Sequence, residues 1–242
     1  MRILLISDIH GNYPALKAVA DYFGQPFDLI LNGGDTTVYA PFDNQTIDWL
    51  RVNKAISILG NTDNHILTLL AGDTFKKPRK AEKRLMYGWT AAELTKTNCN
   101  WLKNQHITRN ISVDAGAQKA YTIGMFHGSP DDHDEFLFID TPEERFERLA
   151  ASSLHPIITV GHSHSPFHKC IGGVHFINPG SVGRMFDGTP KASCATLSLE
   201  NNKIDVELFR IAYPVEAVVA EIEKQRLPSI YKEMYRRGRK LN

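Results

Sequence analysis

Cysteine, net charge and long apolar runs are scarce in this 242-residue sequence. The three cysteines, Cys99, Cys170 and Cys194, are scattered, so they form neither a disulfide framework nor a CxxC metal site, and a cytoplasmic location is expected. The formal net charge of +1 argues against general binding to nucleic acid or to a membrane surface. No apolar run approaches the roughly 18 residues that span a bilayer, and the apolar start is too short for a signal peptide.

The first 60 residues alternate between short apolar runs and amphipathic segments. The apolar runs 2–6, 28–31 and 55–59 have strand length, and helices are expected over 12–23 and 41–52. This alternation predicts parallel strands joined by right-handed crossovers, with both faces of the sheet covered. The fold class is therefore α/β.

Residues from about 64 to 105 break this pattern. Leu85, Met86, Trp89 and Ala92 recur at helical spacing, which predicts an amphipathic helix over 78–97 followed by a short helix. Beyond them the chain reads mostly as strands and closes with two helices. We expect one domain over 1–242, with a helical cap inserted over 64–115.

Potential metal ligands follow five of the apolar runs, each beside a glycine. In open α/β sheets, loops at the carboxyl ends of strands converge on one site. Each motif alone is commonly a turn or a structural histidine, but all five occur in one chain. Together they supply two carboxylates, one amide and four imidazoles, from Asp8, His10, Asp35, Asn61, His127, His162 and His164.

The chemistry of these seven groups predicts the metal and the ligand. Mixed nitrogen and oxygen donors suit Mn, Fe, Zn or Ni better than Mg or Ca, which prefer oxygen alone. Two divalent ions bring four positive charges against the two carboxylates of Asp8 and Asp35. The excess positive charge would attract a phosphate anion, provided that the seven groups converge.

The five motifs, in this order, resemble those of the calcineurin-like metallophosphoesterases. The family pattern is Asp-x-His, Gly-Asp, Gly-Asn-x-Asp/Glu, His-Gly and Gly-His-x-His. It is present here from Asp8 to His164, and the segment Asn178–Ser181 resembles the small prokaryotic branch. The resemblance covers about residues 2–63 and 120–210. It implies a four-layer αββα sandwich of two mixed β-sheets flanked by helices.

The resemblance also implies two divalent metal ions, with Mn favoured and Fe, Zn or Ni as alternatives. One ion would be held by Asp8, His10, Asp35 and His164, the other by Asp35, Asn61, His127 and His162, with Asp35 as the bridge. A hydroxide between the ions would attack phosphorus in line. The residues with implied catalytic roles are Asp8, His10, Asp35, Asn61 and His127.

One position departs from the pattern of many larger members. Thr62 stands where they carry a histidine that assists the leaving group, and a missing general acid typically costs about 10²–10⁴-fold in rate. A good leaving group would make the acid unnecessary, His65 would replace it, or water would protonate the product slowly. Asp63 is expected to orient a metal ligand from behind.

Substrate contacts are predicted outside the motifs. Six basic residues lie between Lys76 and Arg84, and they are either a solvated helix start or cations that the cap offers to extra phosphates. On the second interpretation, Lys76, Lys77 and Arg79 are candidate substrate contacts, and His65 is a further candidate. Arg184, after the Asn178–Ser181 loop, is either a surface residue or a phosphate contact.

The sequence therefore predicts a binuclear metal-dependent phosphoesterase that acts on a small-molecule phosphoester. A nucleotide, a dinucleoside polyphosphate or a phosphodiester are the candidate substrates. A protein serine/threonine phosphatase is the alternative enzyme, and a non-catalytic scaffold with the same fold is the alternative of another class. Membrane and nucleic-acid partners are not expected, and the sequence does not indicate an oligomeric state.

Overall fold

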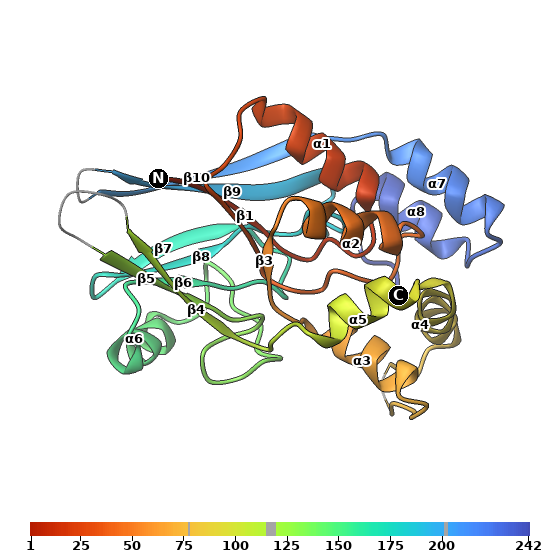
Figure 1. The fold of residues 1–242 in the computed structure, drawn as a ribbon, viewed down its shortest axis with the longest axis horizontal. Helices are drawn as coiled ribbons and strands as arrows, with labels where there is room; N and C mark the ends of the chain where they lie inside the picture. Colours follow the sequence, from red (N-terminus) through yellow and green to blue (C-terminus); the bar gives the residue numbers. More distant parts are fainter. Residues whose placement is uncertain (77, 115–119, 201–202) are drawn as a thin grey trace.

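The computed structural model describes residues 1–76, 78–114, 120–200 and 203–242. These residues form ten strands in two mixed five-stranded sheets, with orders β10-β9-β1-β2-β3 and β4-β5-β6-β8-β7. The sheets face each other, α1 and α2 cover the outer face of the first, and α6 covers the outer face of the second (Figure 1). The predicted α/β fold with two mixed sheets flanked by helices is confirmed.

The first sheet has a parallel half that carries three of the motifs. β1 (Arg2–Ile6) lies at its centre, parallel to β2 (Leu29–Asn32), which is parallel to β3 (Ile56–Ser57). On its other side β1 is antiparallel to β9 (Lys191–Glu200), which pairs with β10 (Lys203–Ala212). The carboxyl ends of β1, β2 and β3 therefore lie at one edge.

The second sheet presents its own parallel strands to the same region. β5 (Ala120–Met125), β6 (Ile157–Thr159) and β8 (Val174–Asn178) are parallel, with β4 (Arg109–Asp114) and β7 (Phe167–Ile171) at the edges. Apolar side chains of both sheets, including Ile3, Leu5, Ile123 and Ile157, form the core between them. This packing fixes the two sets of strand ends relative to each other.

Local signals account for the helices that flank the first sheet. α1 (Tyr13–Phe23) begins where the Asn12 side chain accepts a hydrogen bond from the Ala15 N–H, and it ends at Gly24 in the left-handed conformation. α2 is Asp43–Val52 and α6 is Glu143–Ser152. α1 packs on β9 and β10, and α6 packs on β7.

The segment between the sheets is helical, as expected, but it is divided differently. It contains α3 (Asn61–Leu70), α4 (Ala81–Glu93) and α5 (Lys96–Lys103). The helix expected over 78–97 and the short helix after it are present as α4 and α5, but the expected boundary is wrong, because α4 already ends at Glu93. Leu94 is extended, and the Thr95 hydroxyl accepts from the Asn98 N–H at 3.2 Å, which starts a new helix. α3 was not foreseen as a separate helix. That 64–115 is an insertion stays a prediction, and residue 115 lies outside the described residues.

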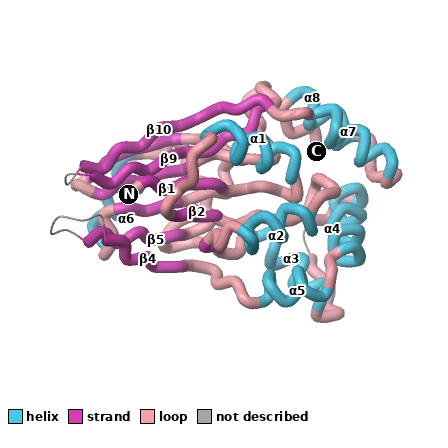
Figure 2. Tube along the Cα trace, turned by 45° about the horizontal axis from the view of Figure 1, so that its top comes forward, coloured by secondary structure: helices cyan, strands magenta, loops and turns pink. Residues whose placement is uncertain are grey.

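The two C-terminal helices pack against the cap. α7 (Val215–Lys224) and α8 (Ile230–Arg237) share a core with α3, α4 and α5 that includes Tyr39, Tyr87 and Tyr231. The C-terminus lies between α8 and α4 in both views (Figures 1 and 2). Within the described part of the chain, no helix has the length and apolarity needed to cross a membrane.

Candidate metal centre

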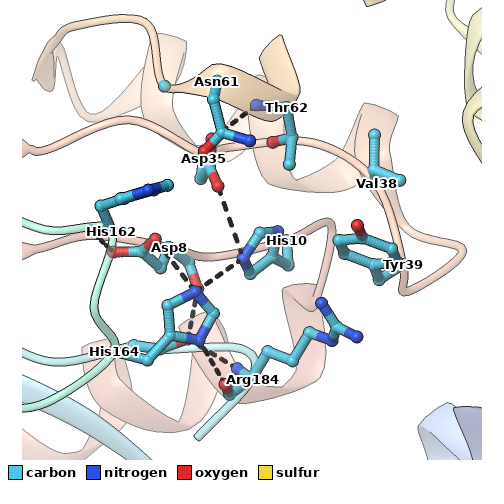
Figure 3. A network of polar contacts seen from close by, with 12 residues as sticks. Asp8, His10, Asp35, Val38, Tyr39, Asn61, Thr62, His162, His164 and Arg184 are labelled. Carbon is cyan, nitrogen blue, oxygen red and sulfur yellow. Dashed lines mark hydrogen bonds and ion pairs between the residues drawn. The ribbon is translucent and has the colours of Figure 1, made fainter. Parts of the chain in front are cut away.

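The seven predicted ligands come together where five strands of the two sheets end. Asp8 and His10 follow β1, Asp35 follows β2, and Asn61 begins α3 directly after β3. The second sheet contributes His127 after β5, and His162 and His164 after β6. Figure 3 labels all of these residues except His127, and the labelled ligands lie around one region.

The ligand atoms form two groups that share one residue. The first contains Asp8, His10, Asp35 and His164, and the second contains Asp35, His127 and His162. Within each group one potential ligand atom per residue lies within 4.8 Å of all the others. The Asn61 Oδ1 lies 3.3 Å from the His127 Nε2 and so adjoins the second group.

Asp35 lies between the two groups. Its Oδ2 is 3.7 Å from the His10 Nε2, and its Oδ1 is 3.5 Å from the His127 Nε2. The His164 Nε2 lies 3.1 Å from that of His10 and 3.2 Å from the Asp8 Oδ1. Asp35 thus contributes to both groups of residues that could hold a metal ion.

Hydrogen bonds behind the imidazoles set their orientation. The His127 Nδ1 is 2.8 Å from the Gly33 carbonyl, the His164 Nδ1 is 2.5 Å from the Arg184 carbonyl, and the His10 Nδ1 is 3.4 Å from the Thr37 carbonyl. A carbonyl only accepts, so each Nδ1 carries the hydrogen. The Nε2 lone pairs therefore face the centre, which is the arrangement that metal-binding histidines use.

The backbone at these ligands is unusual. Asp8, His10, Asp35, His162 and His164 all have φ between 51° and 62°, the left-handed region that residues other than glycine seldom adopt. Such conformations cost about 1–3 kcal/mol each and persist where the surrounding structure enforces them, commonly at functional sites. Strain at five potential ligands in one place indicates a site selected for function.

The electrostatics of the site favour cations. Burial raises the pKa of Asp35 to about 7, and the attraction of His127 offsets this only in part. Burial opposes ionisation of Asp8 too, but the attraction of His164 and other histidines keeps the pKa of Asp8 well below its usual range. Burial lowers the pKa of His162 to about 4 and that of His10 well below its ordinary value. These two imidazoles are therefore neutral near pH 7, as metal binding requires.

One carboxylate oxygen of Asp8 gives a separate indication that the site fits divalent ions. The Asp8 Oδ1 is buried without a hydrogen-bond partner, although the Asp8 Oδ2 accepts from the Ser7 hydroxyl and the His162 N–H. A buried carboxylate oxygen without a donor is costly, and a cation at the centre would satisfy it. Together with four imidazoles, two carboxylates and an amide, this supports a mixed-donor metal site.

Asp63 holds the backbone that carries two of the ligands. Its fully buried carboxylate accepts hydrogen bonds from the N–H groups of Gly60, Thr36 and Thr37, and from the Thr37 hydroxyl. The adjacent Thr62 N–H donates to the Asp35 Oδ1 at 2.8 Å. Asp63 thus ties the loop after β2 to the start of α3, which agrees in kind with its predicted orienting role.

A cleft of about 690 Å³ opens above the two groups. Its floor includes His10, Asp35, Asn61, His162 and His164. Its walls come from the cap, the loops after β2 and β5, the loop before β9 and the C-terminal tail. The wall residues are Tyr39, Thr62, His65, Pro78, Arg79, Lys83, Tyr87, Phe136, Arg184, Phe186 and Lys240. Three of the five predicted substrate contacts, His65, Arg79 and Arg184, are therefore in the cleft.

The remaining predicted contacts are not placed there. Lys76 is exposed and is not among the residues that line the cleft, and Lys77 lies outside the described residues. Arg184 is only 7% exposed, so its interpretation as a surface residue is wrong. Lys240, which was not predicted as a substrate contact, also lines the cleft.

Several cleft residues were not foreseen from the sequence. Tyr39 and Tyr87 face each other in the wall, with their ring centroids 5.9 Å apart. Phe136 stacks on the His162 ring at 4.0 Å although its side chain is 54% exposed. The one available signal for Phe136 was an apolar residue directly after an acidic loop, and no local pattern marks the two tyrosines.

Comparison with known proteins identifies the family. The sequence-family model for the calcineurin-like phosphoesterase superfamily domain matches residues 1–202, and the chain belongs to this family. The chain is similar to a metallophosphoesterase from Sphaerobacter thermophilus, with 26% identity, a TM-score of 0.79, and coverage of 98% of this chain and 99% of that one. A hypothetical protein from Pyrococcus horikoshii shares the fold with a TM-score of 0.84 at 17% identity, covering 98% of both chains.

Two curated relatives differ in how much of this chain they match. An uncharacterized protein of Methanocaldococcus jannaschii is 28% identical over 249 residues, which cover 93% of each chain. A symmetrical bis(5'-nucleosyl)-tetraphosphatase of Klebsiella pneumoniae is 32% identical over 112 residues, 43% of this chain and 37% of that protein. The chain thus spans little more than a third of the tetraphosphatase, and their similarity supports a phosphoester hydrolase without defining its substrate.

Proposed function

We propose that this protein is a binuclear metal-dependent hydrolase of small phosphoesters, with a nucleotide or dinucleoside polyphosphate as its substrate. The observation that carries the proposal is the pair of ligand groups joined by Asp35 at the floor of the cleft. Membership of the phosphoesterase family and the similarity to the tetraphosphatases support the substrate class. Manganese is the favoured metal, with Fe, Zn and Ni as alternatives for the same donors.

The residues divide into those that hold the ions and those that hold the substrate. Asp8, His10, Asp35 and His164 would bind one ion, and Asp35, Asn61, His127 and His162 the other. Two such ions supply a nucleophile from water at neutral pH and stabilise the charge on the phosphoryl oxygens. The aromatic and basic walls of the cleft then orient the remainder of the substrate and restrict the access of water.

Metal content and substrate scope test this proposal together. The purified chain, dialysed against Mn²⁺, should hold two ions per chain by elemental analysis and should hydrolyse bis(p-nitrophenyl) phosphate. A panel of nucleotides, dinucleoside polyphosphates, cyclic nucleotides, diesters and phosphopeptides would then rank the substrates by kcat/KM. Retention of fewer than two ions with no hydrolysis would support the scaffold alternative, and a preference for phosphopeptides would support a protein phosphatase.

His65 is positioned to act as the proton donor that Thr62 cannot be. Its ring lines the cleft, and its Nδ1 lies 2.6 Å from the Asn61 carbonyl, so the Nδ1 carries hydrogen. In the imidazolium form the Nε2 carries a second proton, and that proton is the one that a leaving group would take. In His65→Gln, we expect hydrolysis of diphenyl phosphate to fall by about 10²-fold or more. Hydrolysis of bis(p-nitrophenyl) phosphate, whose leaving group needs no proton, should fall by less than about threefold.

His106→Gln, at an exposed position outside the cleft, is the matched control and should leave both rates unchanged. The His65 ring also packs against Phe75 and Tyr87, so a structural defect would lower both rates equally. An equal fall for the two esters would therefore exclude the proton-donor role.

A further inference from the structure

Arg184 is a buried cation without a counter-charge. Its side chain is nine-tenths buried, and none of the ion pairs among the described residues includes it. Its Nη2 reaches only the Met234 Sδ, at 3.8 Å, and its Nε has no partner. A guanidinium has five donors, and burying it without acceptors is costly. An anion bound beside this guanidinium would satisfy its donors.

Aromatic rings hold this guanidinium beside the metal ligands. Its central carbon lies 3.7 Å from the Tyr39 ring centroid and 5.1 Å from that of Phe186. The Tyr39 ring also contacts the His10 ring, with a centroid distance of 5.2 Å, so one ring separates the guanidinium from a potential metal ligand (Figure 3). Tyr39 is held at φ 86°, a strained backbone conformation that indicates an enforced position.

Three further cations line the same cleft. Arg79 lies just before α4, Lys83 lies in the first turn of α4, and Lys240 comes from the tail beyond α8. Burial and the repulsion of Lys240, Arg184 and Lys80 lower the pKa of Lys83 to about 8, so Lys83, Lys240 and Arg184 are close together. The nearby carboxylate of Glu82 opposes this shift, but less than burial and the three cations promote it.

We infer that Arg184, Lys83, Lys240 and Arg79 form a second anion subsite, which binds a further phosphate of the substrate while its reacting phosphate lies over the metal ligands. The inference rests on the proposed function, because that function identifies the ligand that would reach both the metal ligands and the subsite. Cations from three separate segments meet in one cleft with the metal ligands, and a short polyphosphate can reach both. The subsite combines Arg184 from the loop before β9, two residues of the cap, and one residue of the C-terminal tail.

Methylenediphosphonate, a non-hydrolysable anion with two phosphonate groups, is the probe for this subsite. We expect the metal-free chain to bind it, as measured by isothermal titration calorimetry. The double variant Lys83→Gln/Lys240→Gln should weaken this binding by about 10- to 100-fold, because two charge-assisted contacts are lost. The matched control, Lys96→Gln/Lys103→Gln, removes the same charge from exposed positions on α5 and should bind as the wild type does.

A second experiment uses the metal-loaded chain. With metal in excess, methylenediphosphonate should inhibit hydrolysis of bis(p-nitrophenyl) phosphate, and Lys83→Gln/Lys240→Gln should raise its inhibition constant by about 10-fold or more. The inhibition constant of methylphosphonate, which has one anionic group, should not change.

Three results would overturn the inference: no binding by the metal-free wild type, equal weakening in the two double variants, or an equal rise in both inhibition constants. If the loaded chain hydrolyses no ester, the proposed function fails, and the metal-free binding alone then decides whether the subsite exists.

Discussion

Asp35→Asn should lower hydrolysis of bis(p-nitrophenyl) phosphate by roughly 10²–10⁴-fold, the rate equivalent of the several kcal/mol that a bound metal contributes. Asp35 is the residue that both ligand groups share, and it is 3% exposed. Asparagine retains the oxygen that accepts from the Thr62 N–H but loses the charge and one acceptor oxygen. The variant should therefore hold fewer than two ions by elemental analysis while staying folded.

Asp21→Asn is the matched control for this variant. Asp21 lies on α1, is 64% exposed, and pairs only with Lys17 across one helical turn. Its replacement should leave the rate and the metal content unchanged and should cost less than about 1 kcal/mol of stability. If Asp35→Asn kept two ions and the wild-type rate, the binuclear mechanism would be wrong.

The seven potential ligands could be read from the sequence because each is marked locally. An apolar run, a glycine and a donor residue occur together five times, and parallel strands bring their carboxyl ends to one edge. Their common left-handed backbone could not be foreseen, because no residue type at Asp8, His10 or His164 signals it. That conformation follows from the packing of the loops against each other.

Local sequence patterns do not predict which cations line the cleft. Lys76 and Lys83 belong to the same basic segment, yet of these two only Lys83 lines the cleft, because Lys83 lies in the first turn of α4 and Lys76 lies before that helix begins. Lys240 and Arg184 are 56 residues apart and meet only through the packing of α8 on Tyr39. Contacts between such distant segments depend on tertiary structure, which periodicity does not encode.

Gly60→Ala should inactivate the enzyme without removing any chemical group. A Cβ at residue 60 would lie 2.1 Å from the Asp35 Oδ1 and 2.3 Å from the Asp35 backbone nitrogen. The φ of Gly60 is −96°, which alanine adopts readily, so the effect would come from this collision alone. Asp35 must move, and because it joins the two ligand groups, we expect a loss of about 10²-fold or more in kcat/KM, since misplacement by about 1 Å can cost that much.

The stability of the same variant separates displacement from unfolding. Overpacking at a buried position costs about 1–3 kcal/mol, which a chain of this size should tolerate, so urea denaturation should show a folded protein with a lower midpoint. Gly88→Ala on α4 is the control, because its Cβ would have nothing within 4 Å. It should stabilise the chain by about 0.5–1 kcal/mol and leave the rate unchanged, since alanine is the better helix residue. Full activity of Gly60→Ala would show that Asp35 does not need its observed position, and the bridging role assigned to it would then fail.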